Sequence, residues 1–452
     1  MGSYAKCWLG DLNVGSSRNE IDPNLISLFR QQDKVVLSAP FHKLPASLEH
    51  YRESLEEDSD LKLVYYQVPV NVVRDRLEVL GYTITTVEDA FREWVKGEHA
   101  QKIESMKVWA EQDSETRKLM EDHYRTDAEI LASVTPRSWI EGLKMIRSSE
   151  LETSYHARFE GPHKGTLIGY MLSNEWYGFP GYDVFVPLRL AIEAFGDDGD
   201  LIYDLTDLVW SSNFDEGEDF VEFGLGVSAA EYSSMAKTIV LTEGKTDAWI
   251  LSESFKVLYP HLQDYFSFLD FESTGYGGGV GNLANVVKAF AGAGIVNNVV
   301  ALFDNDTAAA AACKAIEKIA LPANIVIRQL PKLDFLENYP TIGPTGAAKL
   351  DVNGIAASIE LYLGEDVLRL DSGNLAVVQW TGYEKSVNQY QGELLEKSKV
   401  QARFREKLSR HSGPAGPDWD GLRAVFRVLF SAFEEKNRGA ICKRPTEYYG
   451  VS

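Results

Sequence analysis

The chain has 452 residues, of which 44% are hydrophobic and 25% are charged, and its formal net charge is −22. This excess of acid excludes a protein that coats nucleic acid, because affinity for phosphate depends mainly on Lys and Arg. It is compatible with an enzyme that holds nucleic acid through a metal site and a local basic patch.

Residues 1–232 are expected to form an α+β N-terminal domain. The first 42 residues have the Gly, Asn and Pro punctuation of short strands and turns. Residues 45–148 are rich in helix formers, and the ranges 86–112 and 114–132 have the periodicity of amphipathic helices. Residues 151–228 interleave aromatic side chains with Gly, Pro and Asp, which indicates strands and loops that pack on those helices.

Residues 233–335 are expected to form an α/β domain with a central, mostly parallel sheet flanked by helices. Short apolar runs rich in Val, Ile and Leu are typical of strands buried on both faces of such a sheet. They alternate with segments of helical periodicity, and this alternation predicts parallel βαβ units. The predicted strands are 238–242, 265–271, 298–303 and 323–328, and the predicted helices are 245–258, 281–293 and 306–319.

Residues 336–452 are expected to form a C-terminal extension that is mostly helical and basic. A turn at 351–354 leads into a predicted amphipathic helix, and further helices are predicted at 386–410 and 419–437. From Gln391 onward the chain carries 12 basic and 8 acidic residues. A cluster of these cations predicts a nucleic-acid-binding surface: Lys397, Lys399, Arg403, Arg405, Lys407 and Arg410. The alternative is a solvated helical face.

Two of the predicted strands end in carboxylates. Glu243 and Asp247 follow the first strand of the α/β domain, and Asp304 and Asp306 follow its third strand. The carboxyl ends of parallel strands face the crevice where open α/β sheets bind ligands. Carboxylates that converge there repel one another unless a cation lies between them, and oxygen-only ligands favour a hard divalent ion. The sequence therefore predicts a Mg²⁺ site, with Mn²⁺ as an alternative ion.

Two of these acids also have a structural interpretation. Asp247 falls in the first turn of the predicted helix, where the helix dipole favours a negative side chain. Asp306 can cap the helix that follows it. The Gly-Lys-Thr at 244–246 resembles the end of a P-loop, but Ile239 stands where the upstream Gly is required, which excludes a P-loop ATPase.

Cysteine and histidine carry little information in this sequence. The three cysteines are far apart and form no CxxC pair, so neither a disulfide framework nor a zinc ribbon is expected. Arg405-x5-His411 has the spacing of a ribonuclease motif, but Arg117-x5-His123 repeats it, and we attribute the spacing to chance. No signal segment and no apolar run near the roughly 18 residues needed to span a bilayer are found. We therefore expect a cytoplasmic protein without a membrane partner.

The residues 242–247, Thr-Glu-Gly-Lys-Thr-Asp, and 303–307, Phe-Asp-Asn-Asp-Thr, resemble the signature of the Toprim domain. That family includes bacterial primases, topoisomerases and nucleases, and its signature is a Glu after the first strand and Asp-x-Asp after a later one. The resemblance implies that Glu243 binds metal and acts as a general base. It also implies that Asp304 and Asp306 hold the metal ions and that Asp247 completes the ligand set.

Other parts of the chain resemble proteins that carry this domain. Residues 1–11, with Asp22-Pro23 and Asp33-Lys34, are similar to the HEPN/Toprim-associated N-terminal domain. The region from Asp351 resembles the part of overcoming-lysogenization-defect nucleases that supplies acids to a second metal ion, which implies Asp351 and Glu360 as further ligands. The accessory domains of primases and topoisomerases are not found, which points to a stand-alone Toprim effector.

We therefore expect a metal-dependent endonuclease that cleaves phosphodiester bonds in DNA or RNA, with tRNA among the candidate substrates. Proteins of the resembled architecture are inferred to act in bacterial conflict with phage, which implies an antiphage effector with a phage trigger or a partner defence protein. A homo-oligomer is a further expectation. The alternatives are a catalytically silent Toprim scaffold in a defence complex and a nucleotidyl transferase.

Overall fold

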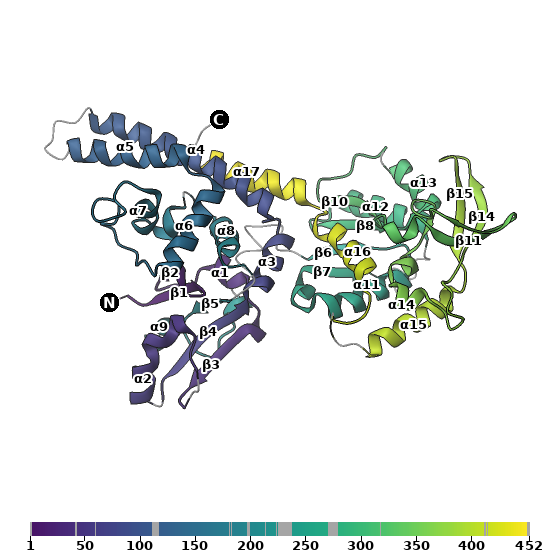
Figure 1. Ribbon diagram of the computed structural model, residues 1–452, viewed down its shortest axis with the longest axis horizontal. Helices are drawn as coiled ribbons and strands as arrows, with labels where there is room; N and C mark the ends of the chain where they lie inside the picture. Colours follow the sequence, from purple (N-terminus) through teal and green to yellow (C-terminus); the bar gives the residue numbers. More distant parts are fainter. Residues whose placement is uncertain are drawn as a thin grey trace. The chain divides into compact units, whose positions relative to one another are not determined.

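The computed structural model divides the chain into two units (Figure 1). Unit 1 comprises Met1–Tyr232 together with Glu435–Ser452, and unit 2 comprises Ser233–Glu434. The sequence analysis predicts three domains, and the structure divides the last of these between the two units. The structure describes every residue except 1, 41–42, 59, 111–116, 180, 182, 197–198, 213, 223, 225–236, 270–278, 317, 411–412, 414 and 450–452.

Unit 1 contains a five-stranded sheet in the order β2-β1-β5-β4-β3, and every neighbouring pair in it is antiparallel. One side of the sheet packs Leu63, Tyr65 and Ile202 against the short helices near residues 46–57. The strands are β1 Tyr4–Leu9, β2 Leu12–Arg18, β3 Lys34–Ser38, β4 Lys62–Pro69 and β5 Asp200–Asp204.

Helices make up most of the rest of unit 1, and the two long amphipathic helices predicted from the sequence are present as α4 and α5. The prediction for residues 151–228 is wrong, because this region forms helices and turns with β5 as the one described strand. Among its aromatic side chains, Phe179 packs against Phe91 and Trp139, with ring centroids 5.9 and 6.4 Å apart. The helices are α1 Pro23–Ser27, α2 Arg52–Glu57, α3 Val70–Val79, α4 Ile84–Ala110, α5 Arg117–Ser133, α6 Pro136–Ser148, α7 Leu167–Leu172, α8 Phe185–Phe195 and α9 Thr206–Trp210.

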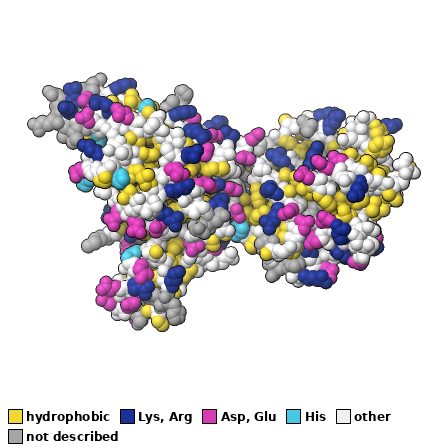
Figure 2. All heavy atoms as spheres, viewed as in Figure 1, with side chains coloured by type: hydrophobic (Ala, Val, Ile, Leu, Met, Phe, Trp, Pro, Cys, Tyr) yellow, Lys and Arg dark blue, Asp and Glu magenta, His cyan; other side chains and the backbone are white. Residues whose placement is uncertain are grey.

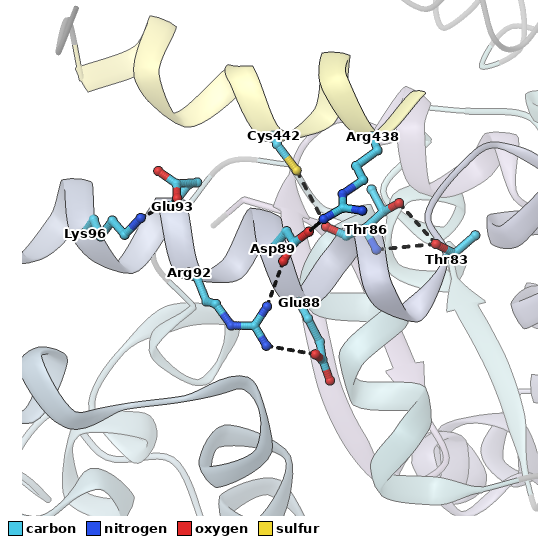
Figure 3. Close-up of polar contacts among 9 residues, drawn as sticks. All are labelled: Thr83, Thr86, Glu88, Asp89, Arg92, Glu93, Lys96, Arg438 and Cys442. Carbon is cyan, nitrogen blue, oxygen red and sulfur yellow. Dashed lines mark hydrogen bonds and ion pairs between the residues drawn. The ribbon is translucent and has the colours of Figure 1, made fainter. Parts of the chain in front are cut away.

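The last helix of the chain, α17 (Glu434–Tyr449), lies against α4 of unit 1 (Figure 3). Arg438 forms an ion pair with Asp89, and Cys442 lies 3.9 Å from the carbonyl oxygen of Thr86. Further along the helix, Arg444 forms an ion pair with the buried Asp183. The predicted helix 419–437 is therefore two helices, α16 (Asp420–Phe430) and α17, and the second packs on the N-terminal unit.

Unit 2 contains a four-stranded parallel sheet in the order β10-β8-β6-β7, which confirms the predicted parallel arrangement. All five residues of β8 are buried, as expected for a strand covered on both faces. The strands are β6 Thr238–Leu241, β7 Phe266–Leu269, β8 Val299–Phe303 and β10 Ile325–Gln329.

The helices predicted between these strands are present as α11 Lys245–Leu258, α12 Val280–Ala293 and α13 Thr307–Ile316. Leu283 and Val287 of α12 and Ala309 and Cys313 of α13 join one hydrophobic core with the sheet. On α11, Phe255 packs against Phe426 of α16, with ring centroids 5.1 Å apart. The sheet is thereby held between helices, and its carboxyl edge lies at the start of α11 and α13.

The rest of unit 2 departs from the sequence prediction. The predicted amphipathic helix after residue 354 is wrong, because these residues form strand β13 (Ala356–Ala357) and a 3-10 helix over Ile359–Tyr362. Nearly all of them are buried, so they have no exposed face of the kind an amphipathic helix requires. Strand β13 pairs instead with β9 (Asn305–Asp306).

The predicted helix 386–410 is also wrong over its first half. Residues 378–394 form a β-hairpin of β14 (Val378–Glu384) and β15 (Gln389–Leu394), and only Lys397–Arg410 is helical, as α15. The hairpin favours glycine at position 392, because a Cβ there would lie 3.0 Å from the carbonyl oxygen of Gln379 on the opposite strand. The remaining elements are β11 Tyr339–Gly343, β12 Gly346–Leu350 and α14 Glu365–Leu368. No helix among the described residues is long and apolar enough to cross a membrane.

Candidate functional site

Glu243 and Asp304, which lie 61 positions apart in the sequence, are in direct contact in unit 2. Strand β6 ends at Leu241 and its parallel neighbour β8 ends at Phe303, so the residues that follow them meet at one edge of the sheet. The Oε1 atom of Glu243 accepts a hydrogen bond from the backbone N–H of Asp304 at 3.1 Å. The predicted meeting of the two acidic motifs is therefore present.

Asp247 lies in the first turn of α11 and also faces this edge. Its Oδ2 atom accepts a hydrogen bond from the backbone N–H of Gly244 at 3.0 Å, a capping contact in addition to the expected first-turn position. Asp247 and Asp304 both line a cavity of about 10 Å³, together with Thr242 and Ile359. This volume is close to the minimum that one water-sized particle occupies.

Asp306 follows β8 by three residues and precedes α13. Its Oδ1 atom accepts a hydrogen bond from the backbone N–H of Ala309 at 2.7 Å, which is the contact of a helix cap. Asp306 belongs to β9, and its register partner in β13 is Ala356. This short pairing brings the segment after residue 355 to the carboxyl edge of the sheet.

The pairing of β9 with β13 also brings Glu360 to this edge of the sheet. Glu360 lies in the 3-10 helix that follows β13. Its side chain is buried and accepts hydrogen bonds from Ser358 at 2.7 Å and from the side-chain nitrogen of Gln401 at 2.9 Å. The sequence analysis did not single out Ser358 or Gln401. No local signal marks them, because Gln401 reaches Glu360 only through the packing of α15.

Burial and mutual repulsion raise the pKa of the carboxyl groups at this edge. The pKa of Glu243 rises to about 7 because of burial and then because of the charges of Asp306 and Asp247. The pKa of Asp247 also rises to about 7, through burial and the charge of Glu360. For Asp304 the pKa lies well above its usual range, first because of burial and then because all the other carboxylates act on it. The pKa of Asp306 is raised by burial. We call Glu243, Asp247, Asp304, Asp306 and Glu360 the carboxylate cluster.

The positively charged side chain of Lys397 lies beside this cluster. Its Nζ atom lies 3.7 Å from Oε2 of Glu360, and 42% of its side chain is exposed. The positive charge of Lys397 also lowers the pKa values of Glu243, Asp247 and Asp306, although burial outweighs it. The charge pattern of the sequence predicts that Lys397 binds nucleic acid, and in the structure Lys397 lies beside the acids.

The other cations of the predicted nucleic-acid surface are mostly engaged on α15. Lys407 is buried, and its Nζ atom donates to the carbonyl oxygen of Leu363 at 2.8 Å and to Asp366 at 2.9 Å. Lys407 is therefore a structural residue that no nucleic acid can reach. The others pair with acids or an aromatic ring: Lys399 with Glu396, Arg403 with Asp371, Arg410 with Glu406, and Arg405 over the ring of Trp249.

Asp351, the sixth predicted metal ligand, makes contacts of a different kind. It is exposed, and its Oδ1 atom accepts hydrogen bonds at 2.9 Å from both the backbone and the side-chain nitrogen of Asn353. Asp351 is not among the causes of the raised pKa values of Glu243, Asp247, Asp304 and Asp306. The structure therefore assigns it to its own turn.

Of the two occurrences of the Arg-x5-His spacing, the described residues cover the first in full. Arg117 forms an ion pair with Glu121 on the exposed face of α5. His123 is largely buried, and its Nε2 atom lies 3.4 Å from Asp127. His411, from the second occurrence of the spacing, lies outside the described residues.

Comparison with known families and proteins gives one match. Residues 1–222 match the family model of the HEPN/Toprim N-terminal domain 1, which supports the resemblance seen at the start of the sequence. The match ends before β6 and does not cover the carboxylate cluster. No curated protein and no solved structure matches this chain.

Proposed function

We propose that unit 2 is a metal-dependent endonuclease that hydrolyses phosphodiester bonds in DNA or RNA. The observation that carries this proposal is the carboxylate cluster, in which five acids meet at one edge of a parallel sheet. The charge of Lys397 offsets part of their repulsion. Like charges held together in a partly buried site favour a bound cation, and carboxylate oxygens favour Mg²⁺ or Mn²⁺.

Carboxylate oxygens are the ligand type that a hard cation prefers. In the described residues, however, these carboxylates do not have the arrangement of metal ligands. No three described His, Cys, Asp or Glu side chains are grouped so that they could hold a metal ion. Instead, Glu243, Asp247 and Asp306 each turn an oxygen toward a backbone N–H. Ion binding therefore requires these side chains to rotate, and the small cavity between Asp247 and Asp304 is the space into which they would turn.

A divalent ion bound here would polarise the phosphoryl group and activate a water molecule. The residues of the chain supply the remaining functions. Glu243, whose pKa is about 7, can accept a proton near neutral pH. The partly exposed ammonium group of Lys397 can neutralise charge on a phosphate oxygen. Ser358 and Gln401 hold the carboxylate of Glu360 in place.

The match of residues 1–222 supports a role in defence. Unit 1 would then sense a phage trigger or bind a partner defence protein, and unit 2 would act on nucleic acid in the cytoplasm. Whether the active form is a homo-oligomer follows from its mass in solution, measured by light scattering with and without substrate.

Cleavage assays on the full chain test the nuclease proposal. Plasmid, single-stranded DNA and tRNA are incubated with Mg²⁺, Mn²⁺ or EDTA. We expect cleavage that requires the metal and that falls at least about 100-fold in Glu243→Gln, because the substitution removes a metal ligand and a proton acceptor. Asp351→Asn is the matched control, and we expect it to retain activity since Asp351 contacts only its own turn.

A silent scaffold is the second candidate, and the absence of a three-ligand group among the described residues favours it. In that case the wild-type protein cleaves none of the substrates with either metal. It also protects infected cells as well with Glu243→Gln as without the substitution. That pair of results would contradict the nuclease proposal.

A further inference from the structure

The hairpin of β14 and β15 in unit 2 presents aromatic side chains to solvent. Tyr390 is 64% exposed and Tyr383 is 49% exposed. Their rings contact each other with centroids 5.3 Å apart, and Trp380 lies 6.4 Å from Tyr390. Figure 2 shows hydrophobic side chains on the surface of unit 2 in the region where Figure 1 draws β14 and β15. We call Trp380, Tyr383 and Tyr390 the aromatic group.

The backbone of the hairpin fixes the position of these rings. Tyr383 and Tyr390 are direct partners in the antiparallel register, so their side chains project from the same face. Under Trp380, a Cβ on Gly343 would lie 2.9 Å from a ring carbon, so the absence of a side chain there lets the indole lie close to β11. Contiguous exposed aromatic side chains are a feature of binding surfaces.

Strand β15 connects the aromatic group to the carboxylate cluster. The hydroxyl of Thr307, the residue after Asp306, donates a hydrogen bond to the carbonyl oxygen of Tyr390 at 2.5 Å. Three residues after the end of β15, Lys397 reaches Glu360. One strand therefore leads from the exposed rings to the lysine beside the acids.

Charge next to the rings fits a phosphate backbone. Lys385 lies exposed in the turn of the hairpin, and the structure gives it no carboxylate within ion-pair distance among the described residues. Lys397 is partly exposed at the other end of β15. By contrast, Lys399, Arg403 and Arg410 on α15 are already paired with acids.

Exposed rings on a strand with a cation before it and after it in the chain suit unpaired nucleotides, because a base stacks on an aromatic face and its phosphate meets the cation. A duplex keeps its bases stacked on one another and offers no free face to such rings. We propose that the aromatic group is a base-stacking platform that holds single-stranded nucleic acid beside the carboxylate cluster. This inference rests on the proposed nuclease function and names its substrate class.

Binding in the absence of catalysis tests the platform. A fluorescently labelled 12-nucleotide single strand and its blunt duplex are titrated with the full chain in EDTA, and fluorescence anisotropy reports binding. We expect tighter binding of the single strand, and a loss of about tenfold in Tyr390→Ala, since one stacked base contributes that much. Tyr390→Phe keeps the ring and should bind as the wild type does. Tyr155→Ala removes a tyrosine with the same exposed fraction, 64%, and should change nothing.

Equal affinity of wild type and Tyr390→Ala for the single strand overturns the platform. A change in oligomeric state in Tyr390→Ala, with unchanged affinity for the oligonucleotide, assigns the rings to a second copy of the chain and also overturns it. If metal-dependent cleavage is lost in Glu243→Gln but is unchanged in Tyr390→Ala, the nuclease proposal is supported and the platform is contradicted. Binding that depends on Tyr390 in a protein that cleaves nothing supports the platform and removes the nuclease.

Discussion

Unit 1 and unit 2 each bury a group of charged side chains, and the two groups are built in opposite ways. In unit 1, Asp127 is almost fully buried and lies 3.2 Å from Arg158, 3.4 Å from His123 and 3.8 Å from Lys102. In unit 2, the carboxylate cluster holds five acids together, and Lys397 lies 3.7 Å from one of them, Glu360. Opposite charges that compensate one another form a structural contact, whereas the gathering of like charges is the observation on which the proposed metal site rests.

The comparison predicts that loss of an acid has opposite effects in the two units, and the larger effect belongs to unit 1. Asp127→Asn removes the buried acid that pairs with Arg158, while Lys102 keeps its pair with Glu98, so we expect a loss of about 3 kcal/mol in the free energy of unfolding. Thermal unfolding followed by calorimetry measures it. Asp122→Asn on the same helix is the control, because its pair with Arg125 is exposed and should contribute less than about 1 kcal/mol. A small effect of Asp127→Asn would break the comparison.

Asp304→Asn should stabilise the metal-free protein, because it removes one of several charges that repel each other. We expect a gain of about 1 kcal/mol, which corresponds to a rise of roughly 2–4 °C in the unfolding temperature of a unit of this size. The same substitution should abolish stabilisation by Mg²⁺ and cleavage. Destabilisation of the metal-free protein by Asp304→Asn would contradict the interpretation that the carboxylates of the cluster repel one another without compensation.

The two groups should also differ in their response to pH, and this is the smallest of the expected effects. Folded Glu243 and Asp247 have pKa values of about 7, above their usual 4.5 and 3.8, so folded unit 2 binds more protons than the unfolded chain in that interval. The contribution of these two groups to the stability of unit 2 is therefore fully present below the lower of these usual values, 3.8, and is lost as the pH rises through about 7. In unit 1 the pKa of His123 is lowered to about 4 and the pKa of Asp127 is raised. As the pH rises, the first shift increases the free energy of unfolding and the second decreases it.

Hydrogen exchange read by mass spectrometry measures this difference within one sample. After correction for intrinsic exchange rates, we expect protection of residues 238–247 and 299–309 to fall between pH 5.5 and 7.5 in EDTA. Mg²⁺ should restore it at pH 7.5, since a bound cation replaces the lost protons. Protection of α4 and α5 should change less. An equal response of both units would remove the distinction drawn between them.

Some positions of the candidate site follow from the sequence because they depend on neighbouring parallel strands. The runs that become β6 and β8 are apolar on both faces, so they had to be buried strands, and their parallel pairing places Glu243 beside Asp304. The start of α11 at Lys245 follows in the same way from Gly244 and the first-turn Asp247. Local residue pattern was sufficient wherever the elements alternate along the chain.

The remaining parts of the site depend on contacts between distant segments. Pairing of β9 with β13 brings Glu360 to the cluster, and the packing of α15 brings Lys397 and Gln401 to Glu360. The same packing buries Lys407, which from the sequence is one more cation in a basic segment. A charge pattern does not reveal its partners, because burial and pairing are properties of the folded chain.

The sequence by itself therefore determined the parallel sheet of unit 2 and the two acidic motifs at its edge, since both depend on short-range patterns of burial and turn formation. Only the tertiary structure decided which further side chains join those motifs, that residues 389–394 form a strand, and that α17 packs on unit 1. Those outcomes depend on the free energy of long-range packing, which no local pattern encodes.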